Sequence, residues 1–444
     1  MSKQVVIAGG GSAGTVAALA AARNGAQVLL LERGECLGGV ATSGALSVWG
    51  PFDDGDRLLD WDRDGRIEAG QPLTPEMQVG KRIIKGIPEE ILQRLTDAGA
   101  ATDYQYGFIP VNPETLKLVL EDMLLECGVE ILYGTQVYDV VRAGDRIAAL
   151  CIGNKRGSQQ LPGEVFIDTT GDADVAEFAG VPTETGRASD GQTQGVTMVF
   201  KLGGANFAGR FYQLREEISQ AEERFTEAYQ RGECTHLYKV GCINKIPGMS
   251  GVVAVNTQHS YNINACDPKD MQKAILQGRR QCHEIAALMK KYLKGFEQSF
   301  LLETAQYLGI RETRRITGKY VFTREDILSA REFADSIGRN AYNLDIHLPG
   351  APGIGDPIFL KPGSSYSIPY SVLLPQKIHN LLVAGRCISS THEAQSSLRI
   401  MPCCMVTGQA AGTAAALCLQ YGCLPGELPI KVLQAKLREQ KVCL

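Results

Sequence analysis

The chain has 444 residues, of which 44% are hydrophobic and 21% are charged, and its formal net charge is −4. This length and composition predict a globular protein of two or three domains with a large core. The slightly acidic balance excludes a general electrostatic attraction to nucleic acid or to anionic membranes. The 13 cysteines are scattered without a Cys-x-x-Cys pair, which excludes the disulfide framework of a small secreted protein.

The first 32 residues have the pattern of a strand, a turn, a helix and a second strand. Residues 3–8 and 27–32 are short apolar runs of strand type, and residues 14–24 form an Ala-rich helical segment. A signal peptide would also begin with an apolar run. The regularly placed glycines and the direct continuation into a second strand favour a βαβ unit instead. We therefore expect a cytoplasmic protein.

The turn between the first strand and the helix contains Gly-x-Gly-x-x-Gly. Gly9 would make the tight turn, Gly11 would let a pyrophosphate approach the backbone, and Gly14 would let the helix pack closely on the strand. Ser12 and Ala13 stand at the entrance to the helix, whose free N–H groups would face the phosphates. The motif predicts a dinucleotide site without choosing between NAD and FAD.

Glu32 ends the second strand, where its carboxylate can accept hydrogen bonds from the adenosine ribose of either cofactor. Two further segments favour FAD. The loop that follows, ERGECLGGVATSG, contains Gly39 and Thr42, which would let the backbone run close under a flat ring system. The sequence FIDTTGD places Thr170 and Gly171 at the end of another strand, in a turn that would return the chain toward the pyrophosphate.

Residues 51–82 form a long polar segment that contains DWDRDGRIE. Asp60, Asp62 and Asp64 match the first half of a calcium-binding loop, but Gln71 stands where a bidentate Glu is needed. This mismatch favours a solvated acidic turn. No metal site is predicted, and calcium binding by the three aspartates is left open.

The pattern of expected helices and strands changes in the middle of the chain. Helical periodicity covers residues 87–99 and 112–128, and a tight hairpin turn is expected at residues 143–145. Between residues 191 and 369, strand-like segments surround polar helices at residues 211–231 and 268–294. This pattern predicts an inserted substrate or cap domain with a mixed or antiparallel sheet.

The strand pattern of the first domain returns near residue 380. The predicted fold is therefore α/β, with a discontinuous Rossmann-like FAD-binding domain made of residues 1–190 and 370–444. Residues 50–110 would contribute a cap or loop region. The Ala-rich helix at residues 405–419 is expected to be too short and too polar to span a bilayer.

Several segments together resemble a known family. The N-terminal fingerprint, GIRETRRITGKYVFTREDIL, IPYSVLLPQ, NLLVAGRCISSTHEA and MVTGQAAGTAAAL occur in an order that resembles the FAD-dependent oxidoreductase family within the glutathione-reductase-like flavoproteins. That family is similar to the flavin subunit of the CoB–CoM heterodisulfide reductase. The resemblance implies bound FAD and a substrate domain of the glutathione-reductase type.

The resemblance also implies particular residues. A helix N-terminus at residues 407–412 would face the pyrimidine edge of the flavin. The loop after the second strand lacks the cysteine pair of disulfide reductases, and no second Gly-x-Gly-x-x-Gly follows a strand. A pyridine-nucleotide disulfide reductase is therefore not expected. The further cofactor contacts implied by the resemblance are Arg33, Ala41, Val137, Gly385, Arg386, Ala411 and Gly412.

Two side chains are candidates for catalysis. His392 lies in the segment expected beside the flavin and could take a proton from a substrate as hydride leaves. The alternative is a structural histidine bonded to the backbone. Arg311 could grip a substrate carboxylate, and the alternative is an internal ion pair with an acid such as Glu312.

The predicted function is hydride transfer between a small organic substrate and flavin N5, with oxygen or an electron-acceptor protein as a further partner. The alternative is a flavin electron-transfer module that works with a partner redox protein. Because no cysteine cluster has iron–sulfur spacing, that module would need an external partner. Neither nucleic acid nor a membrane is expected as a partner.

Overall fold

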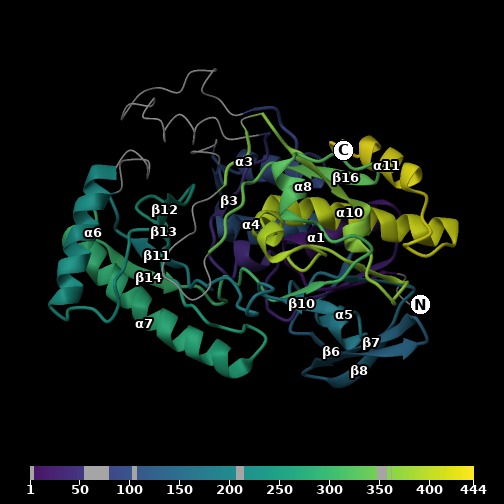
Figure 1. Cartoon of the computed structure of the whole chain (residues 1–444), viewed down its shortest axis with the longest axis horizontal. Helices are drawn as coiled ribbons and strands as arrows, with labels where there is room; N and C mark the ends of the chain where they lie inside the picture. The colour runs from purple at the N-terminus through teal and green to yellow at the C-terminus, as the bar shows by residue number, and fades with distance from the viewer. Residues whose placement is uncertain (1–4, 55–79, 103–107, 207–214, 348–357, 362) are drawn as a thin grey trace.

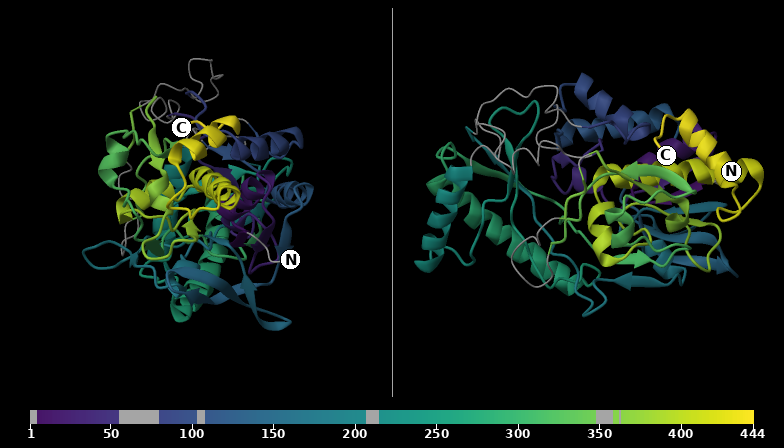
Figure 2. Two further views of the ribbon diagram at one scale, coloured as in Figure 1. Left: turned by 90° about the vertical axis from the view of Figure 1, so that its right-hand side faces the viewer. Right: turned by 45° about the horizontal axis from the view of Figure 1, so that its top comes forward.

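The computed structural model describes residues 5–54, 80–102, 108–206, 215–347, 358–361 and 363–444. The described chain forms two lobes along the long axis of the molecule (Figure 1). The first lobe contains a parallel sheet covered by helices, and the second contains an antiparallel sheet with two long helices. The right-hand view of Figure 2 also shows the two lobes side by side.

The parallel sheet is the core of the first lobe, and its strand order is β18-β9-β1-β2-β5. The central strand β1 is apolar throughout because both of its faces are buried. Val5 and Ile7 pack with the helices on one face, whereas Val6 and Ala8 pack with a β-meander on the other. The predicted α/β fold with a parallel sheet is confirmed. The strands are β1 (Val5–Ala8), β2 (Val28–Leu31), β5 (Glu130–Leu132), β9 (Val165–Asp168) and β18 (Leu381–Val383).

Two glycines allow a helix from the end of the chain to pack closely on a helix from its beginning. Helix α1 (Ser12–Arg23) and helix α10 (Met401–Tyr421) lie side by side, as the left-hand view of Figure 2 shows. A Cβ on Gly408 would overlap the carbonyl oxygen of Ala13, and a Cβ on Gly412 would overlap that of Ala17. The small residues of α10 therefore serve a close helix–helix contact.

Helix α10 is longer than predicted. Its 21 residues make it long and apolar enough to cross a membrane by length and composition alone, so the expected shortness is wrong. Almost all of it is buried inside the protein, where it packs against α1 and the parallel sheet. Its apolar sequence is accounted for by this position in the core.

A three-stranded antiparallel meander covers the other face of the parallel sheet. The turn between its first two strands contains Gly144, whose φ of +66° lies in the left-handed region that favours glycine. The predicted hairpin at residues 143–145 is confirmed. The meander strands are β6 (Gln136–Ala143), β7 (Arg146–Asn154) and β8 (Gly157–Pro162), followed after β9 by helix α5 (Asp174–Phe178).

The second lobe has a separate core beneath an antiparallel sheet of order β12-β13-β11-β14. Its two helices, α6 (Arg215–Gln230) and α7 (Pro268–Tyr292), match the predicted polar helices within the described residues. The apolar face of α7 contributes Ile285 and Leu288 to this core. The strands are β11 (Phe200–Gly203), β12 (Cys242–Lys245), β13 (Val253–Asn256) and β14 (Phe300–Thr304).

The chain returns to the first lobe soon after β14. Strand β15 (Arg314–Ile316) pairs with β10 (Thr183–Thr185), and Phe322 and Tyr366 belong to the core around α1 and α10. The core of the second lobe ends at Leu308. The predicted boundaries of the inserted domain stay a prediction, but this packing favours a shorter insertion that ends before β15.

Smaller elements complete the first lobe. The predicted helices near residues 87 and 112 are present as α3 and α4. Asp60, Asp62 and Asp64 lie outside the described residues. The remaining elements are β3 (Val48–Trp49), α3 (Ile87–Asp97), β4 (Ile109–Pro110), α4 (Pro113–Glu126), α8 (Arg324–Leu328), β16 (Ser336–Asn340), β17 (Tyr366–Pro369), α9 (His392–Leu398) and α11 (Ile430–Glu439).

Candidate functional site

A cavity of about 1370 Å³ runs from the Gly-rich turn after β1 to the sheet of the second lobe. It is large enough for an extended cofactor together with a small substrate. Its walls include nine of the predicted cofactor contacts and one of the two predicted catalytic residues. These are Gly11, Ser12, Ala13, Arg33, Gly39, Thr170, Gly171, Gly385 and Arg386, together with Arg311.

The Gly-rich turn has the geometry that a pyrophosphate site requires. Gly9 has a φ of +103°, and a Cβ there would lie 2.6 Å from the carbonyl oxygen of Thr169. A Cβ on Gly14 would overlap the carbonyl oxygen of Gly9. At Gly11, by contrast, no described atom lies within 4 Å of where a Cβ would stand. Gly9 and Gly14 are therefore needed for packing, whereas the space above Gly11 is open for a ligand.

Glu32 is held by the backbone at the end of β2. Its carboxylate accepts hydrogen bonds from the N–H groups of Gly10, at 2.8 Å, and Gly34, at 2.6 Å. These bonds fix the carboxylate and leave it further lone pairs for ribose hydroxyls. Glu32 is only 7% exposed and does not line the large cavity, whose wall includes its neighbour Arg33.

Next to Glu32, Arg33 lines both the large cavity and a second pocket of about 560 Å³. Gln136 lines this second pocket, but its neighbour Val137 is packed into the hydrophobic cluster beneath the meander. The structure therefore places Val137 beside the pocket and not on its wall.

The loop after β2 divides the predicted contacts into two groups. Gly39 lines the cavity and approaches Gly11, whose Cα would lie 3.2 Å from a Cβ at position 39. Ala41 is buried in the core. The hydroxyl of Thr42 donates to the carbonyl oxygen of Leu37 at 2.5 Å. Ala41 and Thr42 thus stabilise the loop and do not line the cavity.

Arg386 follows β18 and is partly engaged by the protein itself. Its guanidinium donates to Asp172 at 2.7 Å and to the hydroxyl of Thr313 at 3.2 Å. Burial alone would raise the pKa of Asp172, but Arg386 and Thr313 hold it below its ordinary value. This ion pair fixes the guanidinium at the cavity wall beside Gly171.

The predicted helix N-terminus at residues 407–412 is wrong. Helix α10 begins at Met401, so these residues lie in its interior, and Gly412 packs on α1 as described above. Ala411 is fully buried as well, and neither residue lines the cavity. The cavity wall carries Met401 and Cys404 from the true first turn. The small residues indicated a close approach correctly, but the partner is a helix.

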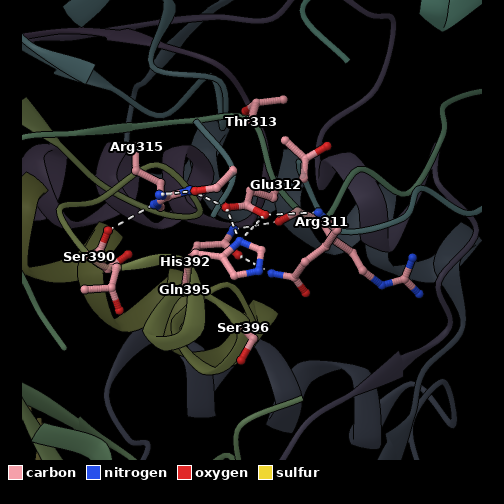
Figure 3. A network of polar contacts seen from close by, with 12 residues as sticks. Arg311, Glu312, Thr313, Arg315, Ser390, His392, Gln395 and Ser396 are labelled. Carbon is pink, nitrogen blue, oxygen red and sulfur yellow. Dashed lines mark hydrogen bonds and ion pairs between the residues drawn. The ribbon is translucent and has the colours of Figure 1, made fainter. Parts of the chain in front are cut away.

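His392 does not reach the cavity wall. Figure 3 shows its ring facing Glu312, and the Nδ1 atom lies 2.9 Å from Oε1 of that side chain. Glu312 is fully buried and also forms a short ion pair with Arg315. The backbone N–H of Gln194 donates to the same carboxylate at 3.0 Å. The structure therefore supports the structural alternative for His392, with a carboxylate rather than the backbone as its partner.

Arg311 is adjacent to Glu312 in the chain, yet its guanidinium points away from Glu312 and His392 (Figure 3). It lines the cavity and donates to the carbonyl oxygen of Gly195 at 2.8 Å and to the hydroxyl of Thr197 at 2.7 Å. In the described part of the chain, no carboxylate is hydrogen-bonded to it. The expected ion pair between Arg311 and Glu312 is not formed, because Glu312 pairs with Arg315.

Five residues that were not predicted surround Arg311 at this end of the cavity. They are buried or nearly so, and they come from both lobes. Two histidine rings stack with their centroids 5.1 Å apart, and the carboxylate among them accepts a hydrogen bond from a tyrosine hydroxyl at 3.2 Å. We call this group, with Arg311, the cationic cluster. Its other members are His259, Tyr342, Asp345, His347 and Arg399.

Asp345 is the only carboxylate among the cluster members. Its Oδ2 atom lies 3.6 Å from Nη2 of Arg399 and 3.7 Å from Nε2 of His347. Burial alone would raise the pKa of Asp345, but its neighbours hold the pKa well below the ordinary value. Burial lowers the pKa of Arg311 to about 9, and the positive charge of Arg399 adds to this effect.

Both histidines of the cluster are neutral near pH 7. Burial, together with the charge of Arg311, lowers the pKa of His259 to about 3 and that of His347 to about 4. Nδ1 of His259 donates to the carbonyl oxygen of Thr257 at 2.9 Å, so its Nε2 accepts from Arg311 at 3.3 Å. Nδ1 of His347 is buried without a hydrogen-bond partner in the described structure.

The sequence holds a weak signal for this cluster. His259 and His347 stand in segments with no recognisable motif, so residue type alone could not select them. Arg399 is the last residue of SSLR and directly follows α9, in the segment expected beside the flavin. Only the fold brings these side chains together, because they come from separate loops and from the end of α9.

A sequence model of the FAD dependent oxidoreductases matches residues 4–437 of the chain. The chain belongs to the FAD dependent oxidoreductase family. It is therefore a flavoenzyme with FAD as its cofactor. The Gly11 turn and the fixed Glu32 carboxylate fit this cofactor. No curated protein sequence matches this chain closely enough to count as a relative.

Several solved structures of flavoenzymes are similar to this family member. A geranylgeranyl bacteriochlorophyll reductase-like protein from Thermoplasma acidophilum is 10% identical, over 99% of this chain and 84% of that chain, with a TM-score of 0.45. A triple mutant of the flavin-dependent brominase Bmp2 is 12% identical, over 98% and 84%, with a TM-score of 0.45. The p-nitrophenol 4-monooxygenase PnpA from Pseudomonas putida is 14% identical, over 72% and 70%, with a TM-score of 0.37.

Proposed function

We propose that this flavoenzyme transfers a hydride between a small organic molecule and N5 of FAD, and that the molecule binds at the cationic cluster. The observation that carries the proposal is the single cavity of about 1370 Å³. Its walls include the Gly-rich turn and Arg386 as well as Arg311, His347 and Arg399. A cofactor and a substrate can therefore meet inside one cavity.

The residues of the first lobe would hold the cofactor. The backbone N–H groups at Gly11, Ser12 and Ala13 open α1 and would bind the pyrophosphate, and Glu32 would accept hydrogen bonds from the adenosine ribose. FAD, when bound, supplies hydride chemistry at N5. The protein supplies the position of the substrate and the management of its proton.

His347 is the best placed proton acceptor of the cluster. Its Nε2 faces Asp345 at 3.7 Å, which favours the tautomer that carries its proton on Nε2. Its Nδ1 then presents a lone pair, and the pKa of about 4 keeps the ring neutral at pH 7. Such a ring can accept the proton of a substrate O–H or N–H group as the hydride leaves the carbon. Asp345 would stabilise the resulting imidazolium.

The proposal also covers the subtype of the fold, the cellular location and the electron acceptor. The meander inserted between β5 and β9, together with a separate lobe with an antiparallel sheet, supports a glutathione-reductase-like arrangement. A cytoplasmic location accompanies it. The electrons would pass on to oxygen or to an acceptor protein.

The alternative proposal is an electron-transfer module that exchanges electrons with a partner redox protein. Such a module would need an external partner for any further redox centre, because no group of three metal-ligating side chains occurs among the described residues. Electron transfer alone, however, needs neither the buried cationic cluster nor the unpartnered Nδ1 of His347. The cavity therefore favours a small-molecule substrate.

An anaerobic screen tests the proposal directly. The purified holoenzyme is mixed with small organic acids, alcohols and amines, and the absorption of the oxidised flavin is followed. We expect at least one of them to bleach the flavin without a second protein. If the flavin bleaches only when a reduced partner protein is added, the electron-transfer alternative holds instead.

A further inference from the structure

We propose that the cationic cluster is a subsite for one carboxylate group, so that the substrates of this enzyme are small organic acids. This inference rests on the proposed function, because it assigns a chemical class to the molecule that exchanges hydride with FAD. It is carried by the charge balance of the cluster, by the unpartnered donor of Arg399 and by the unpartnered acceptor of His347 beside it.

The first argument is the charge balance of the cluster. Arg311 and Arg399 carry two positive charges, and Asp345 carries one negative charge. Arg311 has hydrogen bonds to Gly195, Thr197 and His259, all of which are uncharged acceptors. A buried cation without an anion is costly. One bound carboxylate would restore neutrality, whereas a phosphate dianion would leave an excess of negative charge.

The second argument is the donor that Arg399 leaves free. Its Nη2 donates to the backbone carbonyl oxygen of Asp345 at 3.2 Å and lies 3.6 Å from the carboxylate of the same residue. Its Nε–H is buried and has no partner in the described structure. Buried polar groups without a partner are rare in folded proteins. The edge of the Arg399 guanidinium that carries Nε and Nη2 matches the geometry of a planar carboxylate.

The third argument is the position of His347 beside that donor. Arg399 and His347 both approach Oδ2 of Asp345, so the two side chains are neighbours. The unpartnered Nδ1 of His347 is also buried, and this residue is only 5% exposed. A lone pair at this place would repel a carboxylate oxygen but would accept a hydrogen bond from an adjacent hydroxyl or amine. Arg399 would therefore bind the carboxylate of a short acid, and His347 would bind a hydroxyl or amine on the same molecule.

The surroundings of the cluster offer apolar contacts to the acid. Ile310, Ile400 and Met401 line the cavity next to the cluster and offer apolar contacts to a short carbon chain. The stacking of His259 on His347 holds both rings in place. The subsite thus combines one anionic contact with an apolar wall, as small-molecule sites commonly do.

Binding of propionate to the holoenzyme tests the inference without turnover. Calorimetry and thermal unfolding are measured with propionate, with propionamide and with inorganic phosphate. We expect propionate to bind and to raise the unfolding temperature, and propionamide and phosphate to bind much more weakly. Arg399→Gln should raise the dissociation constant for propionate by at least about tenfold, and Arg399→Lys should restore part of the affinity.

A matched control removes an arginine that lies elsewhere. Arg94 in α3 pairs with Glu126 at the surface, and Arg94→Gln should leave propionate binding unchanged. The inference is overturned if propionate does not bind at millimolar concentration, if propionamide binds equally well, or if Arg399→Gln binds propionate like the wild type. Folding of each variant is checked by the flavin absorption and by the unfolding temperature without ligand.

Two outcomes separate this inference from the proposed function. If carboxylates bind as expected but no small molecule bleaches the flavin anaerobically, the subsite stands and hydride transfer from a small molecule fails. If a neutral molecule bleaches the flavin while carboxylates do not bind, hydride transfer stands and the carboxylate subsite is wrong.

Discussion

Two buried polar groups lie on opposite sides of the segment at residues 311–315, and they differ in how completely they are paired. Glu312 is bonded to His392, Arg315 and the backbone of Gln194. On the other side of the segment, the cationic cluster leaves Nε of Arg399 and Nδ1 of His347 without partners. Residue type does not distinguish the two groups, because each contains histidine, arginine and a carboxylate. The difference lies in the pairing, and it indicates which group is scaffold and which is available to a ligand.

The largest expected effect concerns the paired group. Glu312→Ala would leave Arg315, whose side chain is 2% exposed, as a buried cation without its partner. We expect the free energy of unfolding to fall by about 3–5 kcal/mol, as measured by urea denaturation. The control Asp190→Ala removes the surface pair with Arg187 and should cost at most about 1 kcal/mol. A small loss for Glu312→Ala would show that this network does not support the fold.

A pair of histidine variants tests the distinction in function. His347→Gln should lower the rate of flavin reduction by substrate by roughly 10²–10⁴-fold, because a general base is lost, with FAD still bound. His392→Gln should leave that rate close to normal in the folded enzyme and reduce stability instead, by about 1–3 kcal/mol. Stopped-flow absorption and urea denaturation measure the two effects. The reverse pattern would assign the chemistry to His392.

The smallest expected effect is the pH dependence contributed by His259. Its pKa is lowered by burial to about 3, so the unfolded chain binds this proton at a higher pH than the folded chain does. Stability from this residue is therefore present above about pH 6.5 and is lost as the pH falls toward the folded pKa. Between about pH 7 and pH 4.5, we expect His259→Gln to remove about 2–3 kcal/mol of this acid sensitivity. Equal slopes for the variant and the wild type would contradict the neutral state of His259.

The sequence predicted those features that depend on local pattern. The Gly-rich turn, Glu32 and the helices α3, α4 and α7 follow from glycine spacing and from hydrophobic periodicity, which are local properties. The parallel sheet followed from the same pattern. The interpretation failed where one local signal has two physical causes. The small residues of α10 allow close approach to a ring or to a helix, and only the position of α1 shows that Gly412 meets a helix.

The candidate site was harder to predict than the fold. Arg311 was selected because guanidinium groups bind carboxylates, and its position on the cavity wall agrees with that selection. His392 was selected for its place in the chain, but the direction of a side chain depends on its tertiary partners. His259 and His347 are separated in the chain by α7, β14 and the return to the first lobe. Their stacking is a product of tertiary structure and has no counterpart in the linear sequence.

The contact between α1 and α10 has a consequence for biosynthesis. The carbonyl groups of Ala13 and Ala17 meet Gly408 and Gly412, which are made almost at the opposite end of this sequence. The sheet is also incomplete until β18 pairs with β9. Contacts of such large sequence separation form slowly, because a long loop must close first. On the ribosome, the second lobe can assemble its own core early, whereas the nucleotide-binding turn waits for α10 to emerge. During this interval β9 lacks both its neighbour β18 and the cover of α10, so we expect the nascent enzyme to expose apolar surface that chaperones bind.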